Sequence, residues 1–205
     1  DTKRKLASDS AESTALDDST GVSACIAHRV HSLRTEQGMS LETLAARSGV
    51  SRSMISLIER NEASPTAVVL EKLATGLNVV LASLFAVNPA DGDAAEPTSA
   101  PPVVLRRADQ VSWSDPNSGY LRRNVSPAGA TTASGVVPSP IQIVAVEFPP
   151  QARVAYETGA RDVAIHQQVW VLAGTMQISV GDEQYLLEAG DCLALALDRP
   201  MAFHN

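Results

Sequence analysis

The feature that most constrains the fold is a pair of short amphipathic segments joined by a short turn. Ser40 precedes the first segment, residues 41–47, and Ser51 precedes the second, residues 52–59. A serine just before a helix can accept a hydrogen bond from a free backbone N–H of the first turn, so each serine marks a helix start. Gly49 lies between the segments, where a residue with positive φ is needed. The pattern predicts the geometry of a helix-turn-helix unit.

Further helical segments flank this pair. Apolar residues at helical spacing predict a first helix that begins after Ser23 and a fifth helix over residues 81–85. Between them, the pair Ser64-Pro65 is typical of a helix start, and Gly76 is expected to end that fourth helix. We therefore expect five helices around one apolar core.

Shifts in composition divide the chain into four parts. Residues 1–22 are polar and aperiodic, so we expect a mobile arm with too little apolar area to offset the entropy of ordering. Residues 23–86 are the five-helix domain, and the proline-bearing stretch 87–102 is expected to be a linker. Residues 103–205 alternate apolar and polar positions between Gly and Pro turns, which predicts an all-β sandwich or barrel. The expected fold class is multidomain α + β.

The charge distribution leaves a nucleic-acid partner open. The net charge of −7 divides into −2 over residues 1–24, +1 over 25–85 and −6 over 86–205. A small local basic excess is compatible with phosphate contacts. Cys25 and Cys192 lie far apart in apolar contexts, which is typical of a cytoplasmic protein and not of a disulfide-bonded secreted domain. We expect no membrane segment, because no run of about 18 uncharged apolar residues is present.

The run from Gly38 to Thr66 resembles the XRE class of helix-turn-helix domains, that of Cro and the phage repressors. The positions that carry the resemblance are Leu44-Ala45, Gly49-Val50-Ser51, Ile55, Ile58-Glu59 and Ser64-Pro65. The resemblance implies a lambda-repressor-like domain that binds double-stranded DNA with the start of its third helix in the major groove. It also implies a partly buried ion pair between Arg34 and Glu59. Asn61 stands where the class often has Gly, and Asn tolerates the left-handed conformation.

Carried onto this chain, the resemblance implies eight DNA-contact residues. They are Ser40, Ser51, Arg52, Ser53, Ser56, Leu57, Arg60 and Asn61. Arg52 and Ser53 would lie nearest the base edges, and Arg can hold guanine O6 and N7 with two hydrogen bonds. Arg60 and Asn61 would contact phosphates. A phosphate contact or a merely solvated cation is the alternative for Arg52.

The strand-rich part resembles a cupin, a double-stranded β-helix or jelly-roll barrel. The resemblance rests on the segments 169–174, Gly181-Asp182, 188–191 and 198–205. It implies that a barrel of this kind would continue beyond Asn205 into at least one more strand.

The metal ligands of catalytic cupins are absent from the matching positions. Gln167 stands in place of the Glu and Met201 in place of the second-motif His, and the paired His positions fall on Arg161 and Val163 or on Ala160 and Asp162. His166 and His204 are out of phase with the strand alternation, so we expect them to point outward. The pattern predicts no metal, no other cofactor and no enzymatic activity.

A barrel with apolar walls and a few polar groups suits a small organic effector. The candidate pocket residues are Tyr120, Arg122, Tyr156, Gln167, Trp170 and Met201, with Arg123 beside them. An Arg can hold an effector carboxylate. A solvated position or the rim of a dimer is the alternative for Arg122 and Arg123.

Three functional interpretations remain open at this point. The first is a cytoplasmic transcriptional regulator that binds a palindromic operator as a homodimer and senses a small metabolite in its cupin domain. The second is a cupin-type metalloenzyme of the epoxidase or oxygenase kind with an appended helical domain. The third is an interaction protein whose helical domain binds protein. The missing metal ligands favour the first over the second.

Overall fold

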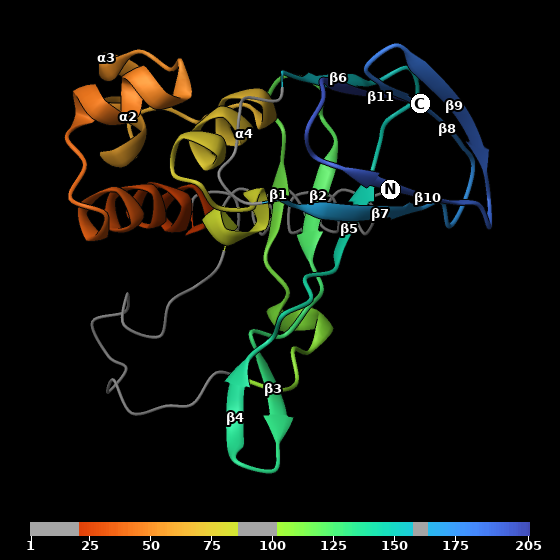
Figure 1. Cartoon of the computed structure of the whole chain (residues 1–205), viewed down its shortest axis with the longest axis horizontal. Helices are drawn as coiled ribbons and strands as arrows, with labels where there is room; N and C mark the ends of the chain where they lie inside the picture. The colour runs from red at the N-terminus through yellow and green to blue at the C-terminus, as the bar shows by residue number, and fades with distance from the viewer. Residues whose placement is uncertain (1–20, 86–101, 158–163) are drawn as a thin grey trace, which may run out of the picture.

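The computed structural model describes residues 21–85, 102–157 and 164–205, and Figure 1 shows how their elements are arranged. A group of helices lies at one end, and all the strands come after it in the chain. The expected arm over 1–22 lies outside the described residues except for its last two, and the expected linker over 87–102 lies outside them except for Pro102. In the described part of the chain, no helix is both long enough and apolar enough to cross a membrane.

Over the described residues 21–85, the helical part contains four α-helices and one short 3₁₀ helix. They are a first helix over residues 21–36, α2 (Leu41–Ser48), α3 (Arg52–Glu59), α4 (Ala67–Gly76) and the 3₁₀ helix η1 (Leu81–Phe85). The fifth helix expected over residues 81–85 is thus a short 3₁₀ helix and not an α-helix. Its five residues are too few for a ladder of i to i−4 hydrogen bonds, and the N–H of Ser83 bonds to the carbonyl of Val80, three residues back.

Two helices also start at residues other than those expected from the sequence. The first helix already includes residues 21 and 22, so Ser23 lies inside it. The start of α4 is capped by Thr66, whose hydroxyl accepts a hydrogen bond from the N–H of Val69 at 3.4 Å. The pair Ser64-Pro65 precedes that cap instead of opening the helix. A threonine caps a helix by the same hydrogen bond as a serine, so Thr66 is chemically as suitable a cap as Ser64.

The strands are short and pair antiparallel throughout. The strand-rich part begins with a 3₁₀ turn, η3 (Arg107–Asp109), and its strands are β1 (Ser112–Ser114), β2 (Leu121–Asn124), β3 (Gly129–Thr132), β4 (Gly135–Pro138), β5 (Val144–Glu147), β6 (Arg153–Tyr156), β7 (His166–Trp170), β8 (Thr175–Val180), β9 (Glu183–Glu188), β10 (Cys192–Ala196) and β11 (Met201–His204). They form four sheets in the orders β1-β2-β5, β3-β4, β6-β11-β8-β9 and β10-β7. Among the described residues, strand pairing thus builds an all-β region without a closed barrel.

The helical and strand-rich parts share one hydrophobic core. Leu70 and Leu73 of α4 belong to the same buried cluster as Trp113, Tyr120 and Val154 from the strands. A chain of aromatic contacts crosses the junction: the ring of Phe85 lies 5.6 Å from Trp113, Trp113 lies 5.9 Å from Tyr120, and Tyr120 stacks on Phe148 at 5.0 Å. The two parts are therefore packed together as one unit.

A buried carboxylate reinforces this junction. Asp115 follows β1 directly and is 3% exposed. Its side chain accepts a hydrogen bond from the backbone N–H of Ala67, the first residue of α4, at 2.8 Å. The same carboxylate accepts hydrogen bonds from the backbone N–H and the hydroxyl of Ser118 at 2.8 and 2.5 Å. A residue 48 positions away thus satisfies a free donor at the start of α4 and complements the helix dipole.

Replacing Asp115 with Ala should destabilise the protein by about 2–4 kcal/mol, because the N–H of Ala67 loses its buried acceptor. Chemical denaturation measures this free energy of unfolding. Asp109→Ala is the matched control, since Asp109 is an exposed carboxylate of η3. Equal stability of the two variants would contradict the role given to Asp115.

Candidate nucleic-acid interface

Helix α3 buries one face and exposes the other. Ile55 and Ile58 are almost completely buried, at 0% and 1% exposure. Ser51 caps the helix, and its hydroxyl accepts a hydrogen bond from the N–H of Met54 at 3.2 Å. Arg52 and Ser53 in the first turn are exposed. The helix is therefore fixed by its buried isoleucines while its N-terminal end faces outward.

The turn between α2 and α3 is built as the sequence predicts. Gly49 has a φ of 69°, in the left-handed region, and its N–H bonds to the carbonyl of Ala45. The buried hydroxyl of Ser48 donates to the carbonyl of Leu44 at 2.7 Å and accepts from the N–H of Val50 at 3.2 Å. A non-glycine residue at position 49 would be strained, because L side chains rarely adopt this φ.

Close packing against α4 fixes α2 in turn. A Cβ atom added to Gly76 of α4 would lie 2.8 Å from the Cβ of Ser48 and 3.0 Å from its backbone nitrogen. Both separations are shorter than ordinary van der Waals contact, so Gly76 allows the two helices to approach closely. This glycine ends α4, as predicted, but its structural role is close contact with α2.

An ion pair ties the first helix to the end of α3. The guanidinium of Arg34 donates to both carboxylate oxygens of Glu59, at 2.6 and 2.7 Å, and to the carbonyl of Met39 at 2.8 Å. The ring nitrogen Nδ1 of His31 lies 3.0 Å from the same carboxylate. Arg34 and Glu59 are 11% and 7% exposed. The geometry confirms the predicted pair and adds His31, which sequence reasoning missed.

Burial by itself would raise the pKa of Glu59, but hydrogen bonds from Arg34 and His31 outweigh it, and the pKa is lowered from 4.5. A carboxylate with a depressed pKa in the folded state stabilises the fold above its unfolded-state pKa, and this stabilisation is lost as the pH falls.

The N-terminal ends of α2 and α3 lie on the same exposed surface. Ser40 caps α2 by accepting a hydrogen bond from the N–H of Thr43 at 3.1 Å. Glu42, in the first turn of α2, forms an ion pair of 2.7 Å with Arg52 in the first turn of α3, and both side chains are 65% exposed. Two helix N-termini with their partial positive charge thus point to one area, which suits a phosphate backbone.

Sequence reasoning missed Glu42. Its own backbone N–H lowers its pKa, and Arg52 lowers it further, so the carboxylate is ionised at neutral pH. A phosphate or a nucleobase that binds Nε of Arg52 would compete with Glu42 for it. The exposure of the pair makes this displacement inexpensive. The contact between Glu42 and Arg52 could have been inferred from the helix-turn-helix geometry, which brings the first turns of α2 and α3 together.

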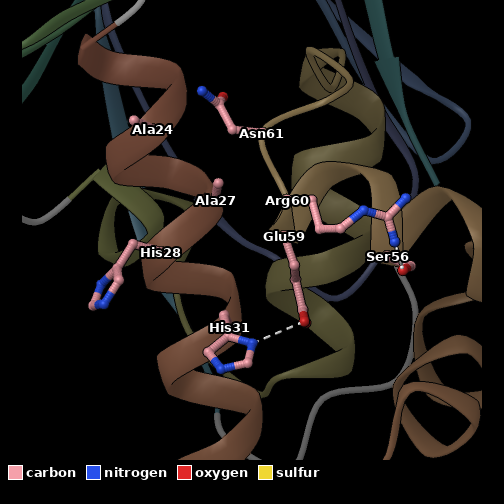
Figure 2. Close-up of a pocket in the computed structure, with 8 residues that line it drawn as sticks. All are labelled: Ala24, Ala27, His28, His31, Ser56, Glu59, Arg60 and Asn61. Atoms are coloured by element: carbon pink, nitrogen blue, oxygen red, sulfur yellow. Dashed lines mark hydrogen bonds and ion pairs between the residues drawn. The ribbon is translucent and has the colours of Figure 1, made fainter.

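A groove of about 430 Å³ lies between the first helix and the end of α3 (Figure 2). Ser56, Arg60 and Asn61 line one side, and His28 and His31 line the other. The guanidinium of Arg60 bonds to the hydroxyl of Ser56 at 2.6 Å and to the carboxylate of Glu62 at 2.8 Å. Asn61 has a φ of 57°, so it does adopt the left-handed conformation.

Comparison with known proteins agrees with this geometry. Residues 30–84 match the family model HTH_3, described as helix-turn-helix. These residues form a helix-turn-helix domain.

Three similar proteins extend the comparison. The chain is 29% identical over 175 residues to the HTH-type transcriptional regulator SutR of Escherichia coli K12, covering 84% of this chain and 83% of SutR. It is 40% identical over 61 residues to the HTH-type transcriptional regulator SinR of Bacillus subtilis, covering 29% of this chain and 55% of SinR. A crystal structure of an HTH_3 family transcriptional regulator from Vibrio cholerae has a TM-score of 0.66 at 22% identity and covers 91% of this chain and 90% of that one. The last match shows a shared fold. Both curated relatives are named as HTH-type transcriptional regulators.

The structure brings three of the expected effector residues together at the edge of the helix-turn-helix domain. The hydroxyls of Tyr120 and Tyr156 lie 3.2 Å apart. The guanidinium carbon of Arg122 lies 5.2 Å from the ring centre of Phe85, the last residue of η1, and its Nε has no hydrogen-bond partner in the described structure. Burial lowers the pKa of Arg122 and raises the pKa of Tyr156.

The other effector candidates are placed differently. Met201 is buried and pairs with Tyr156 across β11 and β6, so it adjoins the tyrosines. Gln167 and Trp170 come from β7, in another sheet, and alternate in exposure along it. Trp170 is 65% exposed and faces away from the side on which Gln167 is half-buried. The three-residue spacing between them puts them on opposite faces, so they are not brought together.

The described residues contain no group of three His, Cys, Asp or Glu side chains that could hold a metal ion. His166 and His204 are exposed, as their strand phase predicts. The expected ligand positions Ala160, Arg161, Asp162 and Val163 lie outside the described residues.

Replacing Glu59 with Gln should lower the free energy of unfolding by about 3 kcal/mol at pH 7, because Arg34 is left in a partly buried site without its partner carboxylate. As the pH falls below 4.5 the carboxylate is protonated first in the unfolded state and then, at its lowered pKa, in the folded state, so the difference between the two proteins should shrink towards zero. Urea denaturation between pH 3 and 7 measures this. A difference that does not vary with pH would contradict the role of the ionised pair.

Proposed function

We propose that the protein is a sequence-specific transcriptional regulator that binds a palindromic operator as a homodimer and responds to a small organic effector. The observation that carries the proposal is the exposed first turn of α3. Arg52 and Ser53 stand there on a helix held by two buried isoleucines and beside the N-terminus of α2. This arrangement suits a helix that enters the major groove with its N-terminal residues towards the bases.

In the proposed interface, some residues contact the bases and others contact the phosphates. Arg52 releases Glu42 and holds a guanine through O6 and N7, while Ser53, Ser56 and Leu57 contact neighbouring base edges. The capped ends at Ser40 and Ser51 offer hydroxyl and amide donors to phosphates, and Arg60 and Asn61 add contacts beyond the helix. Phosphate contacts fix the position of the protein, and base contacts select the sequence.

A homodimer follows from the amount of sequence that one helix can read. A single α3 contacts only a few base pairs, which is too little to define a unique genomic site. Two copies related by a two-fold axis double the contacts and read half-sites about one helical turn apart. The proposed operator is therefore a palindrome.

The strand-rich part is proposed to be a cupin-like sensor. Its short antiparallel strands and its turns at Gly174, Gly181 and Gly190, all with positive φ, support this. Arg122 is the proposed contact for an effector carboxylate, because its Nε is buried without a partner and lies beside two tyrosine hydroxyls. Arg122 also contacts Phe85, so an anion bound there acts where the sensor meets the DNA-binding helices.

Replacing Arg52 with Ala should cost about 1–3 kcal/mol of binding free energy on the preferred duplex and little on random duplex. Fluorescence anisotropy with a duplex selected from a random library measures both. Arg107→Ala removes the same charge from an exposed site in the strand-rich part and is the matched control. If Arg52→Ala leaves both affinities unchanged, Arg52 does not read a base.

Arg60→Ala should act differently, since a phosphate contact carries no sequence information. It should weaken binding to both duplexes. It should also reduce the slope of the logarithm of the binding constant against the logarithm of the salt concentration by about one. A loss confined to the preferred duplex would instead assign Arg60 to base recognition.

Effector and operator should alter each other's affinity by the same factor, because binding free energies at two coupled sites are reciprocal. Isothermal titration of small carboxylic acids and amino acids, with and without operator, tests this. Arg122→Met should abolish the response while leaving operator binding intact. Effector affinities that are identical with and without operator would contradict the coupling.

A further inference from the structure

The first turns of α2 and α3 carry opposite charges on one exposed surface. Glu42 stands in the first turn of α2, whereas the first turn of α3 contains Arg52 and no acidic residue. Oε1 of Glu42 lies 2.7 Å from Nε of Arg52, so the charged ends of the two side chains are side by side. The DNA contacts proposed above use Arg52 and give Glu42 no partner, although a lone carboxylate beside DNA phosphates would be repelled.

Glu42 keeps its charge and its place when Arg52 turns to DNA. The backbone N–H of Glu42 contributes most to lowering the pKa of its carboxyl group, and Arg52 and the hydroxyl of Ser40 lower the pKa further. The backbone N–H and Ser40 both belong to the start of α2, so they remain beside the carboxylate after Arg52 has left it. Glu42 is then an ionised group that needs a new hydrogen-bond donor, and an ionised carboxylate accepts hydrogen bonds only.

The major groove offers such a donor without a neighbouring acceptor at one base. Cytosine presents its N4 amino group there and no acceptor atom. Guanine and thymine present acceptors, and adenine presents the acceptor N7 beside its amino group, so all three repel a carboxylate. Cytosine is therefore the base whose edge complements Glu42.

The separation of the two side chains indicates which base pair Glu42 meets. Successive base pairs are about 3.4 Å apart along the helix axis. The 2.7 Å between the charged ends of Glu42 and Arg52 is close to one such step. A guanine held by Arg52 thus leaves Glu42 over the next base pair.

We propose that Glu42 is a specificity-determining residue that accepts a hydrogen bond from N4 of a cytosine in the base pair next to the guanine held by Arg52. The inference rests on the DNA binding proposed above and adds a base contact from α2. It also gives the ion pair a role in selectivity. Where the cytosine is missing, Glu42 loses Arg52 and gains no donor, so the two side chains stay paired and the guanine contact is weakened.

The test uses the preferred duplex and a panel in which each base pair beside the Arg52-dependent guanine is changed in turn to the three alternatives. Arg52→Ala identifies that guanine, and fluorescence anisotropy measures the affinities. Wild type should lose about 5- to 100-fold in affinity when the neighbouring cytosine is replaced. Glu42→Gln should lose this preference and favour adenine at the same position, because a carboxamide donates to N7 and accepts from N6. The preference for the guanine should remain.

Glu62→Gln is the matched control. Glu62 forms a similar exposed ion pair, with Oε1 at 2.8 Å from Nε of Arg60, and both side chains are 53% exposed. Because Arg60 is proposed to contact a phosphate, loss of this carboxylate should strengthen binding to every duplex by a similar factor and leave the base preferences unchanged.

Two results with Glu42→Gln would overturn the inference. An equal gain in affinity for all duplexes, with the cytosine preference intact, would make Glu42 only a competitor for Arg52. A relaxed preference at the guanine instead of the cytosine would make Glu42 a residue that positions Arg52.

The wild-type panel separates this inference from the proposed function. An Arg52-dependent guanine with no preferred cytosine beside it refutes the role of Glu42 and leaves the proposed function standing. A wild type that binds every duplex equally, or binds none, refutes the proposed function and the inference with it.

Discussion

The structure depends on the hydrogen bond between the Asp115 carboxylate and the first N–H of α4. It joins the strand-rich part to the helix that packs most closely on α2, through the contact of Gly76 with Ser48. Because α2 and α3 are joined by the tight turn at Gly49, this capped end contributes to the position of α3 relative to the sheets. The aromatic contacts from Phe85 to Phe148 fill the same junction with apolar area. An effector bound beside Arg122 would therefore act on a packed interface.

Local signals in the sequence predicted the helix-turn-helix unit well. A capping serine and a left-handed glycine act within three or four residues, so Ser40, Ser51 and Gly49 could be assigned without tertiary information. The Arg34–Glu59 pair was predicted only through the family resemblance. Glu42 beside Arg52 was not predicted, because the contact depends on how two helices cross.

Contacts between residues far apart in the chain could not be predicted from the sequence for the same reason. Asp115 looks like an ordinary turn residue, and its partner lies 48 positions away. In the strand-rich part, alternation predicted an all-β region, but it could not say which sheet each strand joins. Trp170 shows the consequence: its aromatic side chain suggested a pocket, whereas its place in β7 exposes it.

The central claim is that the first turn of α3 reads guanine in the major groove from two symmetric positions. Methylation interference tests it most directly, because a methyl group on guanine N7 blocks the atom that Arg52 would contact. The account predicts strong interference at two symmetry-related guanines about one helical turn, or 10 base pairs, apart. With Arg52→Ala, methylation of those guanines should no longer reduce binding of the protein. Interference at no guanine, or the same pattern with and without the Arg52 side chain, would contradict the account.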